Sequence, residues 1–201
     1  MIDGEMLKSY GAKEVRVSKE EIVFLEGGLP LYYWQVIKGS IKMVNYSPDG
    51  QEFTQGMFHD GESFGEPPLF SDFTYPSNAV AVEDAVLYKL PKENLIRLLK
   101  ENFDVHWMIT NVLSKRLQYK AMIMREMSSH PPEHRILTLI DYLKREEARE
   151  HGGEAYFEVP LTRQQIADMT GLRVETVIRS IKALEEKGKV KIIRRKVYRR
   201  R

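Results

Sequence analysis

The segment Thr162-Arg-Gln-Gln-Ile-Ala-Asp-Met-Thr-Gly-Leu-Arg-Val-Glu-Thr-Val-Ile-Arg-Ser-Ile-Lys-Ala-Leu-Glu185 predicts two short helices joined by a turn at Gly171. Thr162 and Gln165 have the spacing of a capping box that opens the first helix. In the second helix, one side is polar and the other apolar. The polar side carries Glu175, Thr176, Arg179 and Ser180, and the apolar side Val177, Ile181 and Leu184. This pattern predicts a helix-turn-helix whose polar front suits the major groove of double-stranded DNA.

Composition limits the class of protein. The chain has 201 residues, 42% of them hydrophobic, which suits two small domains or one large one. It contains no Cys, which excludes disulfides, thiolate zinc sites and Cys-ligated iron–sulfur clusters. No apolar run approaches the roughly 20 residues of a membrane span, and the first ten residues do not resemble a signal peptide. We therefore expect a cytoplasmic protein without a membrane partner.

The charge is distributed unevenly along the chain. The formal net charge is only +2, but the segment from Lys187 to Arg201 has nine basic residues and no acidic one. A basic end on an otherwise acidic chain fits contact with phosphates. The alternative is a solvated charged tail, and the adjacent helix-turn-helix favours DNA.

The segment from Val15 to Leu90 consists of short apolar runs separated by turn residues. The runs are Ile22–Leu25, Tyr33–Ile37, Ile41–Val44, Phe53–Phe58, Asn78–Val82 and Val86–Leu90. Regularly spaced short strands of this kind predict an antiparallel sandwich or barrel.

A long helix is predicted from Asp104 to Ser129, where Gly and Pro are absent and apolar residues have a helical period. Spacings of four and three residues define a coiled-coil seam, which consists of Leu113, Leu117, Lys120, Met124 and Met127. We expect this seam to be the interface of a homodimer. The alternative is a helix that packs on its own barrel.

His130-Pro-Pro132 ends the long helix and is interpreted as a hinge between domains. We then expect a helix at 135–149, a strand at 156–159 and a closing hairpin, or wing, formed by 190–193 and 197–198. The wing turn at Arg194-Arg-Lys196 lacks the Gly that such a turn favours.

Taken together, these elements resemble the cAMP receptor protein/FNR (CRP/FNR) family of bacterial transcription regulators. The resemblance is carried by Val36-Ile-Lys-Gly-Ser-Ile41, Gly61-Glu-Ser-Phe-Gly-Glu66, Ser114-Lys-Arg-Leu117 and the segment from Leu161 to Leu184. It implies an α+β fold with a cyclic-nucleotide-binding-like antiparallel β-roll (jelly-roll) at 1–103. A dimerisation helix and hinge would follow at 104–130, and a winged helix-turn-helix at 131–201.

The resemblance also implies how the chain reads DNA. In the family, a Glu and an Arg of the second helix read base edges, and Glu175 and Arg179 match them one helical turn apart. Further contacts are expected from Thr162, Arg163, Arg173, Thr176 and Ser180. Arg163 and Arg173 are equally well interpreted as solvated charges.

The resemblance implies an effector site in the roll, to which we assign Gly65, Glu66, Ser77 and Lys120. The family's phosphate-binding Arg is replaced by Pro76, and Lys120 and Ala121 stand where cAMP-binding members offer hydroxyls. Both departures count against cAMP. Gly65 and Glu66 have an alternative interpretation as a turn glycine and a bridging acid. No iron–sulfur cluster is expected, and no ligand spacing is recognised among His59, His106, His130, His134 and His151, so we expect no metal site.

The leading hypothesis is therefore a dimeric, sequence-specific transcription regulator, not an enzyme, whose roll senses an unidentified small molecule. RNA polymerase is an expected further partner. A second hypothesis is a regulator that binds DNA without any effector, its roll having lost the site. A cupin-like metalloenzyme is a remote third, because His59 is the only His in the barrel region.

Overall fold

The computed structural model describes residues 2–48, 50, 52–150 and 155–200. The chain divides into two compact units, Met1–Leu117 and Gln118–Arg201. The long helix α3 (Phe103–Ser129), close to its predicted bounds, contributes residues to both units. None of the described helices is long and apolar enough to cross a bilayer.

The described part of the first unit contains two four-stranded antiparallel sheets. One sheet runs in the order β1 (Lys13–Val17), β8 (Ala85–Pro91), β3 (Tyr32–Lys38) and β6 (Ser63–Phe64). The other runs in the order β2 (Ile22–Phe24), β7 (Asn78–Ala81), β4 (Ile41–Tyr46) and β5 (Glu52–Phe58). Each predicted apolar run forms one of these strands. The expected β-roll and the α+β class are confirmed.

The core of the roll lies between the two sheets. Alternation along the strands directs every second side chain inward, so Ala85 and Leu87 of β8 are buried. They meet Trp34 and Phe64, whose rings stack at 6.5 Å between centroids. Burying a side chain of the size of Leu87 or Phe64 stabilises the fold by about 1.5–3 kcal/mol.

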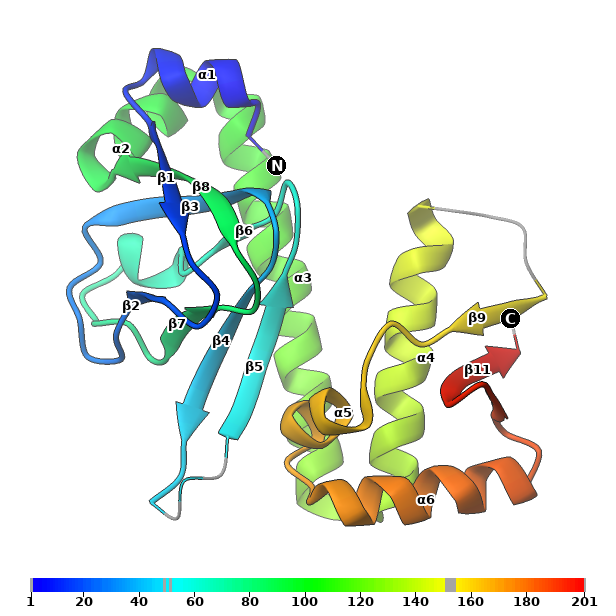
Figure 1. The fold of residues 1–201 in the computed structure, drawn as a ribbon. Coiled ribbons are helices and arrows are strands. Elements are labelled where there is room, and N and C mark those ends of the chain that lie inside the picture. The colour runs from blue at the N-terminus through cyan, green and yellow to red at the C-terminus, as the bar shows by residue number, and fades with distance from the viewer. Residues whose placement is uncertain (1, 49, 51, 151–154, 201) are drawn as a thin grey trace. The chain divides into compact units, whose positions relative to one another are not determined.

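A second core in the same unit joins its helices to β3 and β8. Figure 1 shows α1 (Gly4–Ser9) and α2 (Lys92–Glu101) grouped at one end of the roll with the first turns of α3. Leu7, Leu95, Leu98 and Ile109 are buried there together. The short helix α1 was not predicted. Its start is fixed by Asp3, whose carboxylate accepts the backbone N–H of Met6 at 3.0 Å. A further single turn, η1, spans Pro67–Leu69.

The second unit contains α4 (Pro132–Glu150), β9 (Tyr156–Glu158), α5 (Arg163–Thr170), α6 (Val174–Glu186), β10 (Lys191–Ile193) and β11 (Lys196–Arg200). Its strands pair in the order β10-β11-β9, and one core unites helices and strands through Ile136, Ile166, Ile181 and Val197. Helix α4 begins at Pro132 instead of the expected 135, because proline suits the first helical position.

Candidate nucleic-acid interface and effector site

Both ends of α5 are fixed by local contacts. The hydroxyl of Thr162 accepts the backbone N–H of Gln165 at 3.1 Å, and the side chain of Gln165 accepts that of Thr162 at 2.8 Å. Gly171 then ends α5 in the left-handed region, with a φ of 65°. These contacts confirm the predicted capping box and turn, and they orient α6 on the surface of the second unit.

Helix α6 has one buried and one exposed face. Val177, Ile181 and Leu184 are buried in the core, as predicted. Residues at spacings of three and four form the exposed face, which consists of Glu175, Ile178, Arg179 and Lys182. Glu175 and Arg179 are therefore presented together, within reach of the same groove.

Ser180 lies on the other face. It is only 8% exposed, three residues after buried Val177 and four before buried Leu184. The expectation that Ser180 belongs to the polar front is therefore wrong, because helical geometry at 100° per residue turns this position into the core. Ser180 marks the edge of the apolar face and is removed from the candidate interface.

The remaining expected DNA contacts differ in exposure. Thr162 and Arg173 are exposed, and Arg173 is the residue that precedes α6. Arg163 and Thr176 are half-buried. Burial lowers the pKa of the Arg163 guanidinium, against an opposing effect of Glu185. Arg163 is thus not a freely solvated surface charge.

Ile178 was missed by the sequence reasoning. Its side chain is 42% exposed, at the edge of the polar face and one turn after Glu175. An apolar side chain in a major groove can contact the methyl group of thymine. The signal was its position three residues after Glu175, which a strict helical projection places on the reading face.

The wing turns through Arg194 and Arg195, which connect β10 to β11 with Ile193 opposite Lys196. Both residues have positive φ, 48° and 69°, as a two-residue type I′ hairpin requires. Glycine is absent, so the turn places two arginines in a conformation that costs about 1–2 kcal/mol each. Neither forms an ion pair within the described residues, and both are exposed.

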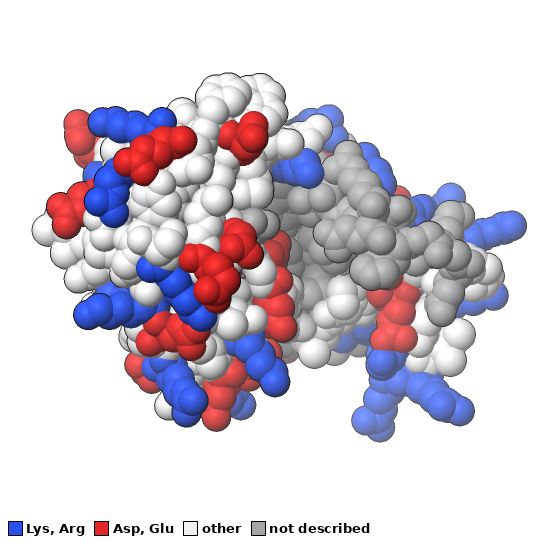
Figure 2. All heavy atoms as spheres, turned by 90° about the horizontal axis from the view of Figure 1, so that it is seen from above, with Lys and Arg blue, Asp and Glu red and all other residues white. Residues whose placement is uncertain are grey.

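Three other basic residues of the C-terminal segment form ion pairs within the second unit. Arg199 pairs with Asp141 at 2.8 Å, Lys187 pairs with Glu133 at 2.6 Å, and Lys196 pairs with Glu158. The two exposed arginines of the wing tip are not compensated in this way. On the face of the roll seen in Figure 2, by contrast, acidic and basic side chains are interspersed.

In the expected effector site, Glu66 is saturated by neighbours from its own unit. The carboxylate is 1% exposed and accepts Nη1 of Arg116 at 2.8 and 2.7 Å. It also contacts the hydroxyl of Ser63, whose backbone carbonyl accepts Nη2 of Arg116 at 2.6 Å. Burial raises the pKa of Glu66, while Arg116 opposes that rise. The sequence did not identify Arg116, which lies fifty residues away in α3.

Gly65 has a structural reason to be glycine. Its φ is 71°, and a Cβ at this position would lie 2.8 Å from the ring of Phe24. That ring stacks on Tyr75 at 3.7 Å between centroids. The position therefore requires glycine for packing, whether or not a ligand binds.

Ser77 and Lys120 complete the expected site. Ser77 is fully buried, and its hydroxyl has no hydrogen-bond partner among the described residues. Lys120 is an exposed residue of α3 in the second unit. The structure thus brings Gly65 and Glu66 together with Ser63 and Arg116. The Ser77 hydroxyl remains without a hydrogen-bond partner among the described residues.

The residues of the expected dimer seam differ from one another. Leu113 is half-buried and packs on the helical core of the first unit. Leu117 and Met124 are 70% and 71% exposed, and Lys120 is exposed. The side chain of Met127 lies outside the described residues.

Two family models match the chain: a cyclic nucleotide-binding domain at residues 14–102 and a Crp-like helix-turn-helix domain at residues 134–200. The chain is 29% identical over 165 residues to the cAMP-activated global transcriptional regulator CRP of Haemophilus influenzae, covering 81% of this chain and 72% of that one. It is 27% identical over 170 residues to the cyclic AMP receptor protein of Thermus thermophilus, covering 85% and 76%. A solved structure of the c-di-GMP responsive global regulator CLP of Xanthomonas campestris shares the fold, with a TM-score of 0.78 and 21% identity over 99% of this chain and 100% of that chain.

Proposed function

Because the chain belongs to the CRP/FNR family of transcription regulators, we propose that it is a homodimer that binds a near-palindromic DNA site. Each α6 would enter the major groove of one half-site, with the two half-sites about 34 Å apart. The observation that carries this proposal is the exposed face of α6, where Glu175 and Arg179 stand side by side on a buried apolar back.

The polar face of α6 supplies the base readout. Arg179 donates two hydrogen bonds to guanine O6 and N7, and Glu175 accepts from cytosine N4. Ile178 adds an apolar contact to a thymine methyl. Arg194 and Arg195 at the wing tip bind phosphates, which orients the unit on the duplex without reading sequence.

Exposed apolar residues on α3 supply the dimer contact. Phe103, Trp107, Leu117 and Met124 are 73%, 63%, 70% and 71% exposed. Their positions fit one stripe with alternating spacings of four and three, which small residues at 110, 114 and 121 complete. The proposed interface therefore keeps Leu117 and Met124 from the expected seam and adds Phe103 and Trp107. Leu113 packs instead in the helical core of the first unit.

The roll does not take cAMP in this proposal. The carboxylate of Glu66 is already hydrogen-bonded by Arg116 and Ser63, and Pro76 stands in place of the phosphate-binding arginine. These observations favour a regulator that binds its site without an added nucleotide. In such a regulator the roll acts as a dimer platform and as a contact for RNA polymerase. If another small effector binds instead, the buried Ser77 hydroxyl is the group that would contact it.

Sedimentation equilibrium and fluorescence anisotropy with a labelled duplex test the dimer and its role together. Leu117→Glu places a charge in the proposed interface and should give monomers with strongly weakened DNA binding. Gln118→Glu, at the exposed neighbouring position, should remain dimeric and bind normally. A dimeric Leu117→Glu variant, or a wild-type monomer of full affinity, would contradict the proposed assembly.

A further inference from the structure

Two histidines and one glutamate meet at the junction between α3 and α4. Glu126 lies in the last turns of α3, His130 in the connection and His134 in the first turn of α4. One ligand atom from each residue lies within 4.8 Å of the others. All three belong to the second compact unit, so the cluster does not depend on how the two units are arranged.

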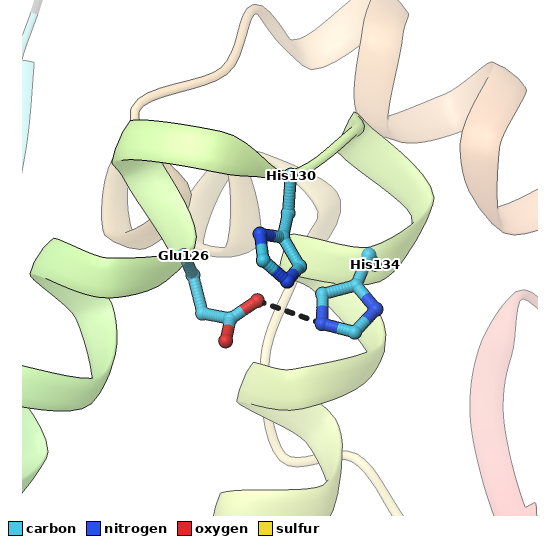
Figure 3. Close-up of side chains that lie close together, drawn as sticks. All are labelled: Glu126, His130 and His134. Atoms are coloured by element: carbon cyan, nitrogen blue, oxygen red, sulfur yellow. Dashed lines mark ion pairs between the residues drawn. The ribbon is translucent and has the colours of Figure 1, made fainter.

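The three side chains converge in space. Nε2 of His134 lies 3.0 Å from a carboxylate oxygen of Glu126, and the rings of His130 and His134 are 4.2 Å apart at their centroids. Figure 3 shows a ring nitrogen of His130 pointing into the gap between the Glu126 carboxylate and the His134 ring. Two imidazole nitrogens and a carboxylate oxygen form a set that binds first-row transition metals.

The geometry matches a small metal ion closely. Bonds of about 2.0–2.1 Å in a tetrahedral arrangement place ligand atoms about 3.3 Å apart. The Glu126–His134 pair is slightly closer than that, at 3.0 Å. The remaining distances are below 4.8 Å, so binding would require rotation of both the His130 and the half-exposed His134 side chains.

Hydrogen bonding does not account for the position of His130. Its Nδ1 is buried and has no hydrogen-bond partner among the described residues. Burying an unpaired ring nitrogen is unfavourable, and the other nitrogen faces the cluster. A metal bound in the cluster would be coordinated by the nitrogen that faces it, and Nδ1 would stay without a hydrogen-bond partner among the described residues.

Neighbouring groups hold the ligands in place. The 2% exposed Glu126 is contacted by Arg125 Nη2 at 3.3 Å and by the hydroxyl of Thr138 at 3.4 Å. The backbone carbonyl of His130 accepts Nε of Arg135 at 3.0 Å. Hydrogen bonds of this kind to a ligand carboxylate help to fix its orientation.

We propose that Glu126, His130 and His134 bind one divalent transition-metal ion of the Zn²⁺ class. The ion would take one carboxylate oxygen and one nitrogen from each ring, and solvent or a fourth ligand would complete a tetrahedron. To coordinate, Nε2 of His134 must release the hydrogen that it donates to Glu126, either to Nδ1 or to solvent. The bound ion would cross-link the end of α3 to the start of α4.

Isothermal titration of the untagged full chain, stripped of metal with a chelator, tests this site with Zn²⁺ as the probe. The wild type should bind one Zn²⁺ per chain. His134→Ala and His130→Ala should each lower the affinity at least about tenfold, since changes even in supporting groups have effects of that size. His106→Ala, at an exposed position near the start of α3, is the matched control and should bind as the wild type does.

Two further readouts separate coordination from general damage. Zn²⁺ should raise the Tm of the wild type and of His106→Ala, each relative to its own metal-free value, but not that of His134→Ala. Co²⁺ should give visible absorption bands only with an intact ligand set. The proposal is overturned if the wild type takes up no stoichiometric Zn²⁺, or if both cluster variants bind Zn²⁺ as tightly as the wild type.

Discussion

Nη1 of Arg116 lies 2.8 and 2.7 Å from the two carboxylate oxygens of Glu66, a residue that is 1% exposed. The pair joins α3 to the loop after β6 within the first unit, and the Arg116 guanidinium also lies 4.9 Å from the ring centre of Phe58. A buried charge with its partner removed is strongly unfavourable. This ion pair therefore gives the roll an internal reason to retain Glu66, apart from any ligand.

Replacing Arg116 should destabilise the first unit. We expect Arg116→Met to lower the free energy of unfolding by about 3–5 kcal/mol, because Glu66 would remain buried without a partner. Urea denaturation measures this change. Lys115→Met, at the exposed neighbouring position, should leave stability within about 0.5 kcal/mol of the wild type. Equal stabilities of the two variants would show that the Glu66–Arg116 pair contributes little.

The loss of unfolding free energy in Arg116→Met should also depend on pH. Burial already raises the pKa of Glu66 above its ordinary 4.5, so the folded state favours the protonated form and this group stabilises less as pH rises through its folded pKa. Removing Arg116 removes the influence that lowers this pKa. The difference in unfolding free energy between the wild type and Arg116→Met should therefore be smallest near pH 4.5 and should grow toward neutral pH. Denaturation curves across that range test this, and a deficit that grows on acidification would contradict it.

Arg179 and Ser180 are adjacent in sequence but should differ in their effects on DNA binding. Arg179→Ala should weaken binding by roughly 1–3 kcal/mol and relax specificity at one base pair. Ser180→Ala should leave the base preference unchanged, because Ser180 is buried in the back of α6. Anisotropy titrations with a panel of single-base variants measure both. Unchanged sequence preference in Arg179→Ala would remove it from base readout.

Ile178 should set a preference for thymine. Ile178→Ala should lose discrimination at one A·T pair by roughly 1 kcal/mol, with little change in stability, since the side chain is 42% exposed. Lys182→Ala, one turn further along the same face, should weaken binding to all sequences alike. Competition with duplexes that carry uracil in place of thymine isolates the methyl contact. An undiminished thymine preference in Ile178→Ala would refute it.

The wing turn should be stabilised by glycine. Arg195→Gly should raise the free energy of unfolding by about 1 kcal/mol, because φ is 69° at this position. It should also reduce the salt dependence of DNA binding by about one unit of slope, as one phosphate contact is lost. Arg195→Gln removes the same charge without relieving the backbone, so it should change the slope but not raise stability. Stabilisation by Gln equal to that by Gly would indicate charge repulsion instead.

Much of the fold follows from local sequence signals. The strands of the roll were predicted because short apolar runs are separated by turn residues, and the capping box and Gly171 define α5 independently of the rest of the chain. The six-residue α1 escaped because so short a helix has no measurable period. The predicted start of α4, at 135, was three residues too late. Pro132 was interpreted as ending the preceding helix, but proline is also favoured at the first position of a helix.

The candidate sites were less predictable. Their geometry depends on residues far apart in the sequence, or on whether one helical position faces the core or the solvent. Ser180 was expected on the exposed face of α6 but is buried, although its neighbour Arg179 is exposed. Arg116 contacts Glu66, which is fifty residues earlier in the sequence. Glu126, His130 and His134 are spaced by four, but the prolines interrupt the helix between them. Only the turn between α3 and α4 shows that the three side chains converge.

The most direct test of the central claim is selection of binding sites from a random duplex library, using purified protein without added ligand. A homodimer with one α6 in each half-site should enrich a two-fold symmetric sequence with half-sites one helical turn, about 34 Å, apart. Adding cAMP should not change the enriched site or its affinity. Failure to enrich any site, enrichment only of an asymmetric one, or enrichment that requires cAMP would contradict the account.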